Sequence, residues 1–361
     1  MQGVVLVRFG LIGCGWIVER CHAPSIRRVG DIEVVAVADP APGRAELVGS
    51  LFGLAARDCL TDYRELLARD DIDAVSIGTP PATHREIIEA VAAAGKSAIC
   101  EKPLATTLAD ADAAIAAAEA AGITLAMYHN YLYYNGTRVA QELIASGAIG
   151  TVIATEIRGM GLRPWVGNEA YRPGWRFTVD EGGGGALMDA GVHALYLTEL
   201  LHGAPIESVC AAMRHEESGI DASAFCQLRM ANGGIGTVHI GWIHGDAGFS
   251  IQGTDGYMVF TYDEPVGYFG FPVRAIRVFR EGRPAETHYL PLEFNVMEPQ
   301  LYRDLVGTLA GGSQSYPAFG RDGRRSLEVA VAAYVSDARR TIVELPIPAS
   351  DPVYERGLAA L

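Results

Sequence analysis

The feature that most constrains this sequence is a glycine turn that directly follows an apolar strand near its start. Residues 4–12 are largely apolar and β-branched, as in a strand buried on both faces of a parallel sheet. Gly13-Cys14-Gly15 then supplies the first two glycines of a dinucleotide-binding turn, where the backbone approaches a pyrophosphate closely. The helix expected over 16–29 points its first N–H groups, those of Trp16 and Ile17, at the same pyrophosphate.

Two further residues of this unit bear on how the cofactor fits. Val18 occupies the third glycine position of the turn, so we expect the helix and the strand to pack less closely there. A second apolar strand over 32–38 ends at Asp39, whose carboxylate can bind both ribose hydroxyls and repel a 2′-phosphate. We therefore favour NAD. NADP remains an alternative because Arg44 lies nearby in sequence, and Asp39 can also be a simple turn former before Pro40.

Strand and helix patterns alternate through the rest of the first half. Repeated β-α-β units predict a parallel sheet with right-handed crossovers. Ligands bind such sheets beyond the carboxyl ends of the strands. The expected strands are 74–78, 98–100 and 123–127, and the expected helices are 63–68, 85–94 and 108–121. The residues that this arrangement gathers at one edge are Gly13, Asp39, Thr79, Lys102 and His129.

Lys102 stands directly after one of these strands. Most lysines are solvated surface charges. This lysine lies at the ligand-binding edge, and Pro103 after it disfavours a helix and restricts its backbone. Its placement favours a functional role over a solvated one.

A run of four glycines, Gly182 to Gly185, leads into an apolar segment that carries an acid and a histidine. If that segment is helical, Asp189 and His193 are i,i+4 neighbours on one face. A carboxylate beside an imidazole can fix its tautomer and tune its pKa, which suits proton transfer. A helix N-terminus with a solvated polar face is the plainer interpretation of the same pattern.

The segment before the glycine run, 162–177, is irregular, aromatic and arginine-bearing. Trp175 and Arg176 could form a substrate wall, or the segment could be a surface loop pinned by its tryptophans. Arg176 could also simply pair with Asp180 and Glu181 nearby. The sequence leaves these alternatives open.

From residue 151 the pattern changes to strands joined by short turns, which predicts an antiparallel sheet. Such a sheet can leave one face for a partner. Two helices, 296–309 and 324–339, are expected to pack back on it. The expected strands are 151–158, 207–213, 224–230, 234–242, 249–253, 256–262 and 276–280.

Composition excludes several classes of function. The 361 residues carry 29 Lys plus Arg against 43 Asp plus Glu, a net charge of -14, which argues against nucleic acid or anionic membrane as the main partner. The six cysteines form no CxxC pair, and no His/Asp/Glu cluster has metal-site spacing. No stretch is long and apolar enough to span a membrane, and the early apolar run is too short for a signal peptide. We expect a cytoplasmic protein without a metal.

Four motifs together resemble the glucose-fructose oxidoreductase/inositol dehydrogenase/rhizopine catabolism (Gfo/Idh/MocA) family. They are Gly13-Cys14-Gly15, Gly78-Thr79-Pro80, Glu101-Lys102-Pro103 and the stretch from Gly183 to His193. The segment from Ala333 to Ala338 resembles the family's C-terminal helix. The likeness covers nearly the whole chain, and the combination of Glu-Lys-Pro with Asp-x-x-x-His is specific.

The resemblance implies an α/β architecture. An N-terminal Rossmann domain over 1–127 binds NAD(P), and a C-terminal domain over 128–361 with a large, open, mostly antiparallel sheet binds substrate and self-associates. By position, Lys102, Asp189 and His193 match the family's catalytic trio. The cofactor-binding residues, including those taken from the glycine turn, are then Gly13, Gly15, Trp16, Ile17, Asp39, Thr79, Pro80, His84, Glu101 and Lys102.

One departure from the family pattern lies after the fifth expected strand. Asn130 keeps its place, but Tyr131 stands where the family often has arginine. This argues against an anionic substrate held by this segment, because tyrosines suit stacking on sugar C–H faces and hydroxyl hydrogen bonds. With Trp175 and Arg176, these two residues are the expected substrate contacts.

The resemblance implies an NAD(P)-dependent enzyme that moves a hydride between the nicotinamide and a secondary alcohol or ketone of a sugar, cyclitol or related polyol. We expect His193 to exchange the hydroxyl proton and Lys102 to bind the reacting oxygen, although these two roles could be exchanged. Asp189 is expected to orient the imidazole or to hold a neighbouring hydroxyl. The resemblance also implies a homodimer or homotetramer that forms through the open sheet face. The alternatives are an NAD-dependent glycoside hydrolase or lyase that oxidises its substrate transiently and a non-catalytic NAD-linked sensor.

Overall fold

The computed structural model of the chain describes residues 6–161, 164, 166–167, 174–262, 273–291, 298–312 and 316–361. It divides into two compact units. The first comprises Met1–Ala105, Ala109–Asn130 and Asn295–Arg324, and the second comprises Thr106–Leu108, Tyr131–Phe294 and Arg325–Leu361.

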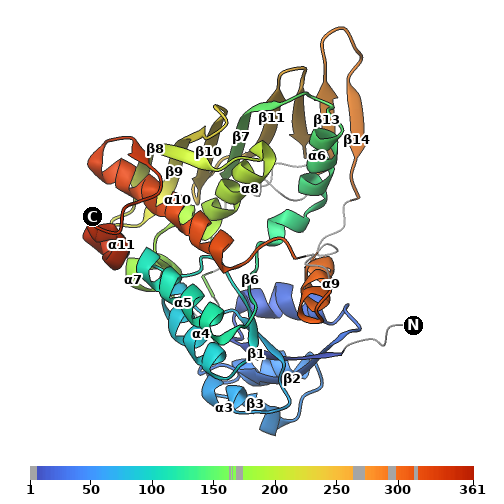
Figure 1. Cartoon of the computed structure of the whole chain (residues 1–361), viewed down its shortest axis with the longest axis vertical. Helices are drawn as coiled ribbons and strands as arrows, with labels where there is room; N and C mark the ends of the chain where they lie inside the picture. Colours follow the sequence, from blue (N-terminus) through green and yellow to red (C-terminus); the bar gives the residue numbers. More distant parts are fainter. Residues whose placement is uncertain are drawn as a thin grey trace. The chain divides into compact units, whose positions relative to one another are not determined.

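The first unit is built on a six-stranded sheet in the order β3-β2-β1-β4-β5-β6, in which every pair is parallel (Figure 1). The strands are β1 (Val7–Ile12), β2 (Ile32–Ala38), β3 (Cys59–Leu60), β4 (Ala74–Ile77), β5 (Ser97–Cys100) and β6 (Leu125–Met127). The chain adds β2 and β3 on one side of β1 and then β4, β5 and β6 on the other side, which is the arrangement of a doubly wound Rossmann sheet. The predicted parallel sheet is therefore confirmed.

Helices connect these strands, and a further helix from late in the sequence joins the same unit. They are α1 (Ala23–Ile26), α2 (Arg44–Ser50), α3 (Tyr63–Leu67), α4 (His84–Ala93), α5 (Leu108–Ala121) and α9 (Glu298–Leu309). The expectation that the helix over 296–309 packs on the second sheet was wrong, since α9 contacts α1. Its Tyr302 is fully buried and hydrogen-bonds His22 of the first helical segment.

That first helical segment is not a regular α-helix. A π-helical stretch, Val18–His22, precedes α1. Val18 is fully buried, and its methyl group lies against Gly78 at the end of β4, where any Cβ would collide with it. Room for the valine in the third glycine position thus comes from a glycine on the neighbouring strand.

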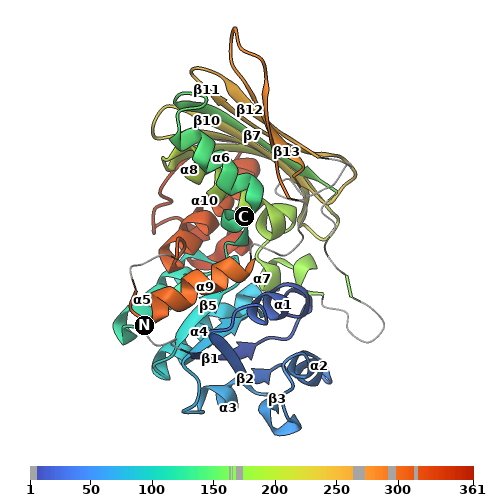
Figure 2. The same cartoon turned by 90° about the vertical axis from the view of Figure 1, so that its right-hand side faces the viewer.

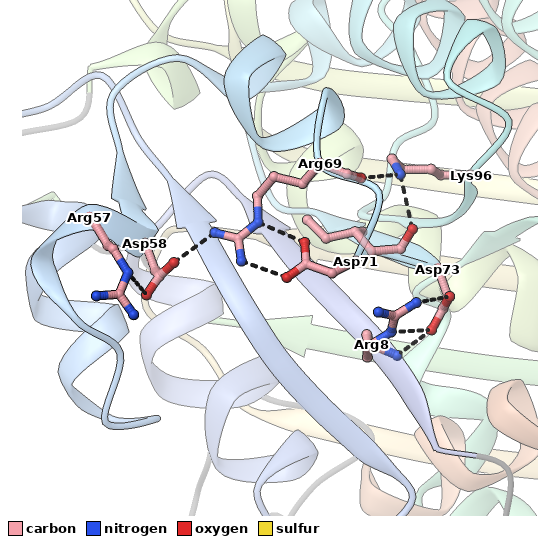
Figure 3. A network of polar contacts seen from close by, with 8 residues as sticks. Arg8, Arg57, Asp58, Arg69, Asp71, Asp73 and Lys96 are labelled. Atoms are coloured by element: carbon pink, nitrogen blue, oxygen red, sulfur yellow. Dashed lines mark hydrogen bonds and ion pairs between the residues drawn. The ribbon is translucent and has the colours of Figure 1, made fainter.

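The amino ends of β1, β4 and β5 are held by a polar network (Figure 3). Arg8 donates to both carboxylate oxygens of Asp73, at 3.3 and 3.1 Å. Arg69 bridges Asp71 and Asp58, and the buried Lys96 donates to the carbonyls of Arg69 and Ile72. These charges satisfy one another at the edge opposite the ligand-binding end of the strands, so we assign them to stability.

The second unit contains a nine-stranded sheet in the order β14-β13-β12-β11-β7-β10-β9-β8-β15. Only β7 and β10 pair in parallel, so the predicted large and mostly antiparallel sheet is confirmed. The strands are β7 (Val152–Met160), β8 (Ile206–His215), β9 (Asp221–Met230), β10 (Ile235–Gly241), β11 (Ala247–Gly253), β12 (Tyr257–Thr261), β13 (Ala275–Phe279), β14 (Glu286–Tyr289) and β15 (Val343–Glu344).

Helices cover one face of this sheet (Figure 2). The second unit's helices are α6 (Asn135–Ala145), α7 (Val179–Gly182), α8 (Val192–His202), most of α10 (Gly320–Arg339) and α11 (Pro352–Arg356). Along β9 the side chains alternate, with Cys226 and Leu228 buried beneath the helices and Phe225 and Gln227 exposed on the other side. Among the residues that the structure describes, no helix is both long and apolar enough to cross a bilayer.

Candidate active site

The glycine turn after β1 has the geometry that a pyrophosphate requires. Gly13 adopts a φ of 85°, and a Cβ on it would lie 2.8 Å from the carbonyl carbon and oxygen of Gly78. Only glycine fits there without strain. Gly15 follows, and the helical segment begins at Trp16, so the first-turn N–H groups of that segment point out of its start with no acceptor within the helix. The turn therefore fits a dinucleotide.

Asp39 holds this turn from the neighbouring strand. Its carboxylate accepts the backbone N–H of Cys14 at 2.6 Å and that of Ala41 at 2.8 Å. Asp39 is buried. The acid at the end of β2 therefore lies beside the glycine turn, where an adenosine ribose is recognised in Rossmann domains.

The loop after β4 and the loop after β5 are joined by His84. The imidazole is fully buried, with Nδ1 3.0 Å from the carbonyl oxygen of Pro103 and Nε2 2.9 Å from that of Thr79. Burial lowers the pKa of His84, and a neutral imidazole donates only one hydrogen bond at a time. The His84 ring thus lies between the backbone carbonyls of Thr79 and Pro103, which precede Pro80 and follow Lys102 in the two loops.

Glu101, directly before Lys102, anchors the end of β5. One oxygen accepts the Lys102 N–H at 3.0 Å, and the other lies 3.0 Å from Nε2 of the fully buried His22. Nδ1 of His22 contacts Ser76 at 2.9 Å and the Tyr302 hydroxyl at 2.7 Å. Burial alone would raise the pKa of Glu101, but the hydrogen bond and charge of His22 and the charge of Lys102 bring it below its usual value. The carboxylate therefore stays ionised beside Lys102.

His129 and Asn130 follow β6 at the same edge of the parallel sheet and are both buried. Burial lowers the pKa of His129 to about 3. His129 is therefore neutral at physiological pH and cannot serve as a cationic phosphate ligand.

In the second unit, the glycine run is shaped by one buried acid. Asp221 is fully buried and accepts the N–H groups of Gly185 and Leu187, both at 2.8 Å, and the Tyr334 hydroxyl at 2.5 Å. A Cβ on Gly185 would lie 2.6 Å from an Asp221 carboxylate oxygen and closer still to its carbonyl. Within this unit, the glycines let the backbone approach Asp221 and Tyr334.

Asp189 lies in a π-helical segment, Leu187–Gly191, that leads into α8. A π turn is wider than an α turn. The backbone between Asp189 and His193 is therefore not the single regular α-helix on which their predicted i,i+4 spacing was based. Oδ1 of Asp189 accepts from Nε of Arg176 at 3.3 Å, and the Arg176 guanidinium lies 4.1 Å from the centre of the Trp175 ring. The structure thus brings Asp189, Arg176 and Trp175 together. Trp165, Tyr171 and Arg172 of the same loop lie outside the described residues.

His193 stands near the start of α8 and is buried. Its Nδ1 lies 2.8 Å from the hydroxyl of Tyr196, and its ring stacks on that of Tyr131 with centroids 4.3 Å apart. The Tyr131 N–H also donates to the Tyr196 hydroxyl, at 3.3 Å. The predicted substrate residue Tyr131 is therefore a direct neighbour of the predicted proton-exchanging histidine.

Sequence reasoning missed the residues that hold these groups in place. Tyr196 follows His193 by three residues on an apolar helix, and that spacing was the available signal. Asp221 opens a strand whose predicted start was residue 224. His22 gave no local signal, because its partners come from distant parts of the sequence. Over the part of the chain that the structure describes, no group of three His, Cys, Asp or Glu side chains is placed to hold a metal ion.

Comparison with known proteins agrees with this geometry. The oxidoreductase family with an NAD-binding Rossmann fold, GFO_IDH_MocA, matches residues 7–129, and the GFO/IDH/MocA C-terminal domain matches residues 137–259. The 1,5-anhydro-D-fructose reductase of Ensifer adhaerens is 32% identical over 260 residues, which cover 70% of this chain and 75% of that protein.

Two further similarities span almost the full length. The dTDP-3,4-didehydro-2,6-dideoxy-alpha-D-glucose 3-reductase of Saccharopolyspora spinosa is 30% identical over 92% of this chain and 98% of its own. A levoglucosan dehydrogenase in complex with NADH and L-sorbose superposes with a TM-score of 0.81 at 25% identity, covering 95% of this chain and 99% of that one. The chain therefore belongs to the Gfo/Idh/MocA family of NAD(P)-dependent oxidoreductases.

Proposed function

We propose that this enzyme oxidises a secondary hydroxyl of a neutral sugar, anhydrosugar or cyclitol, or reduces the corresponding ketone, with Lys102, Asp189 and His193 acting on the substrate. The observation that carries the proposal is the buried His193, held at Nδ1 by the Tyr196 hydroxyl and stacked on Tyr131. An imidazole fixed in this way presents Nε2 for proton exchange.

The chain's residues manage the proton while the nicotinamide, when bound, accepts or supplies the hydride. In oxidation, Nε2 of His193 takes the hydroxyl proton as the C–H hydride leaves, and the product is a ketone. The Tyr196 oxygen can accept from Nδ1–H both before and after this transfer, because only Nε2 gains or loses a proton. Lys102 donates a hydrogen bond to the reacting oxygen and stabilises its developing negative charge.

Asp189 and its partners select the substrate in this proposal. The Arg176 guanidinium is already paired with Asp189 and stacked on Trp175, so it does not call for an anionic substrate. Tyr131 and Tyr134 have ring centroids 4.3 Å apart and add an aromatic surface next to His193. Aromatic rings with hydroxyl and carboxylate groups beside them suit the C–H faces and hydroxyls of a neutral sugar ring. By their names, the similar 1,5-anhydro-D-fructose reductase and levoglucosan dehydrogenase act on uncharged sugars, which supports this class.

The test is steady-state formation of reduced nicotinamide with a panel of aldoses, anhydrosugars, cyclitols and sugar acids, with NAD and NADP side by side. We expect a stoichiometric ketone product and one reduced cofactor per turnover with a neutral substrate. Turnover that releases an aglycone without net reduced cofactor would instead support the glycoside hydrolase or lyase. Absence of turnover across the panel in both directions would favour the sensor.

The exposed face of the nine-stranded sheet supports self-association. Register places four exposed apolar side chains on this face, opposite the helices. They are Phe225, Ile235, Tyr257 and Tyr289. We expect a dimer or tetramer in sedimentation velocity, and monomers for the double variant Phe225→Glu, Ile235→Glu. Leu47→Glu, an exposed leucine of the first unit, is the matched control and should leave the assembly intact. A monomeric wild type would contradict the proposal.

A cytoplasmic location completes the proposal. Cys14, Cys100 and Cys226 are buried thiols and not halves of a disulfide. Reduced thiols are typical of cytosolic proteins. Fractionation of the host cells should recover the protein with cytosolic markers, and recovery from an extracytoplasmic fraction would contradict this location.

A further inference from the structure

Arg44, the first residue of α2, lies against the glycine turn rather than in solvent. It is buried, and its guanidinium donates to the Cys14 carbonyl from Nε at 2.8 Å and from Nη2 at 2.5 Å. Nη2 also donates to Oε2 of Glu19, at 2.9 Å. Glu19 in turn belongs to the π-helical stretch that follows the turn. The arginine is thus fixed between the turn and the helix.

Asp39 and Arg44 bind the two backbone polar groups of Cys14, its N–H and its carbonyl. Asp39 accepts the N–H of Cys14 at 2.6 Å, and Arg44 donates to its carbonyl. A guanidinium is the usual partner of a 2′-phosphate in Rossmann domains that bind NADP. Here it is committed to a carbonyl and to the Glu19 carboxylate, with the arginine and glutamate side chains only 11% and 22% exposed. The exposed Arg20 pairs with the other oxygen of Glu19, at 3.3 Å, and keeps that carboxylate in place.

We propose that Glu19 is a specificity-determining residue: it holds Arg44 on the Cys14 carbonyl, away from a 2′-phosphate, and thereby makes the enzyme select NAD over NADP. Glu19 acts through Arg44 and does not itself touch the cofactor. The inference rests on nucleotide binding at this turn, and it is independent of the sugar chemistry.

Glu19→Gln tests this proposal because it keeps the size of the side chain and removes its charge. The guanidinium then loses its ionic partner and becomes available to a 2′-phosphate. We would measure dissociation constants of 5′-ADP and 2′,5′-ADP by titration calorimetry, which needs neither substrate nor turnover. Since one charge-assisted hydrogen bond is at stake, the affinity for 2′,5′-ADP relative to 5′-ADP should rise about tenfold.

The matched control is Glu46→Gln. Glu46 is an exposed acid on α2, close enough to influence the pKa of Cys14 through its charge. Glu46→Gln removes the same charge from an exposed side chain, so the affinity ratio should stay at the wild-type value. The double variant Glu19→Gln, Arg44→Met should return the ratio of Glu19→Gln to the wild-type value, since the guanidinium that binds the phosphate is then gone.

Three results would overturn the proposal while leaving nucleotide binding to the wild-type protein intact. The first is an unchanged ratio in Glu19→Gln, with 5′-ADP still bound. The second is an equal loss of both ligands, which would mean that Glu19 only maintains the turn. The third is a wild type that binds 2′,5′-ADP as tightly as 5′-ADP. A wild type that binds neither ligand would contradict nucleotide binding at the turn and the proposal with it, whereas a missing sugar activity would leave the binding result intact.

Discussion

Replacing Lys102 with methionine should lower kcat about a thousandfold, because the substrate oxygen loses the charged donor that stabilises its negative charge. The affinity for NAD should fall far less than kcat, because Lys102 is only one of the expected cofactor-binding residues and the glycine turn is untouched. Lys102→Arg, which keeps the charge but not the shape, should recover only part of the rate. The measurement is steady-state kinetics with the substrate found in the panel, alongside cofactor titration.

A double-variant cycle with His193→Ala shows whether the two residues act together. If both act on the same oxygen in one transition state, the double variant should be little slower than the slower single variant. His202→Asn, a buried histidine on the same helix that contacts Thr155, serves as the control and should leave kcat unchanged. An unchanged kcat in Lys102→Met, or losses that multiply in full, would contradict the shared role.

The second large effect concerns stability. Asp221→Asn should lower the free energy of unfolding by about 3 kcal/mol. The amide NH2 of asparagine cannot accept a hydrogen bond, so at least one buried N–H or hydroxyl that donates to the carboxylate would lose its acceptor. Three donors depend on this acid, namely the N–H groups of Gly185 and Leu187 and the hydroxyl of Tyr334. Burial raises the pKa of Asp221 against the opposing effect of these hydrogen bonds, so the site already carries a desolvation cost.

Urea unfolding monitored by circular dichroism measures this loss. Glu217→Gln, in the exposed turn between β8 and β9, also replaces a carboxylate with an amide on the same hairpin and should cost almost nothing. Because Asp221 fixes the glycine run before Asp189, we also expect Asp221→Asn to lower kcat under conditions where it remains folded. An unfolding free energy equal to that of Glu217→Gln would contradict this account.

The sequence was most informative where physical signals are local. The β2 strand and α5 begin and end at the predicted residues, because apolar runs and alanine-rich stretches end at clear turn signals. The gathering of Gly13, Asp39, Thr79 and Lys102 at one sheet edge followed from topology alone. The short strands β14 and β15 were missed because Glu286–Tyr289 and Val343–Glu344 are too short or too polar to show a period of two.

What the sequence could not supply were contacts between residues that lie far apart along the chain. Glu19 and Arg44 are 25 residues apart, and Asp221 reaches Gly185 across 36. Neither pair has a spacing that any helix or strand pattern marks. The helix α9 was placed on the wrong sheet because its apolar stripe indicates burial but not the surface that covers it.

The packing of Val18 against Gly78 has a consequence for recognising such turns. Where a helix residue packs against a residue at the end of a strand, a clash is avoided if either of the two residues is a glycine. Here the small residue lies 60 positions further along the chain, on the strand that neighbours β1, and the bulky one occupies the helix. A dinucleotide motif defined as three glycines in one short run therefore misses turns in which the glycine that makes room comes from another part of the chain. The physical requirement is enough space between the first helical segment and the end of the neighbouring strand, and a small residue on either of these two segments can provide it.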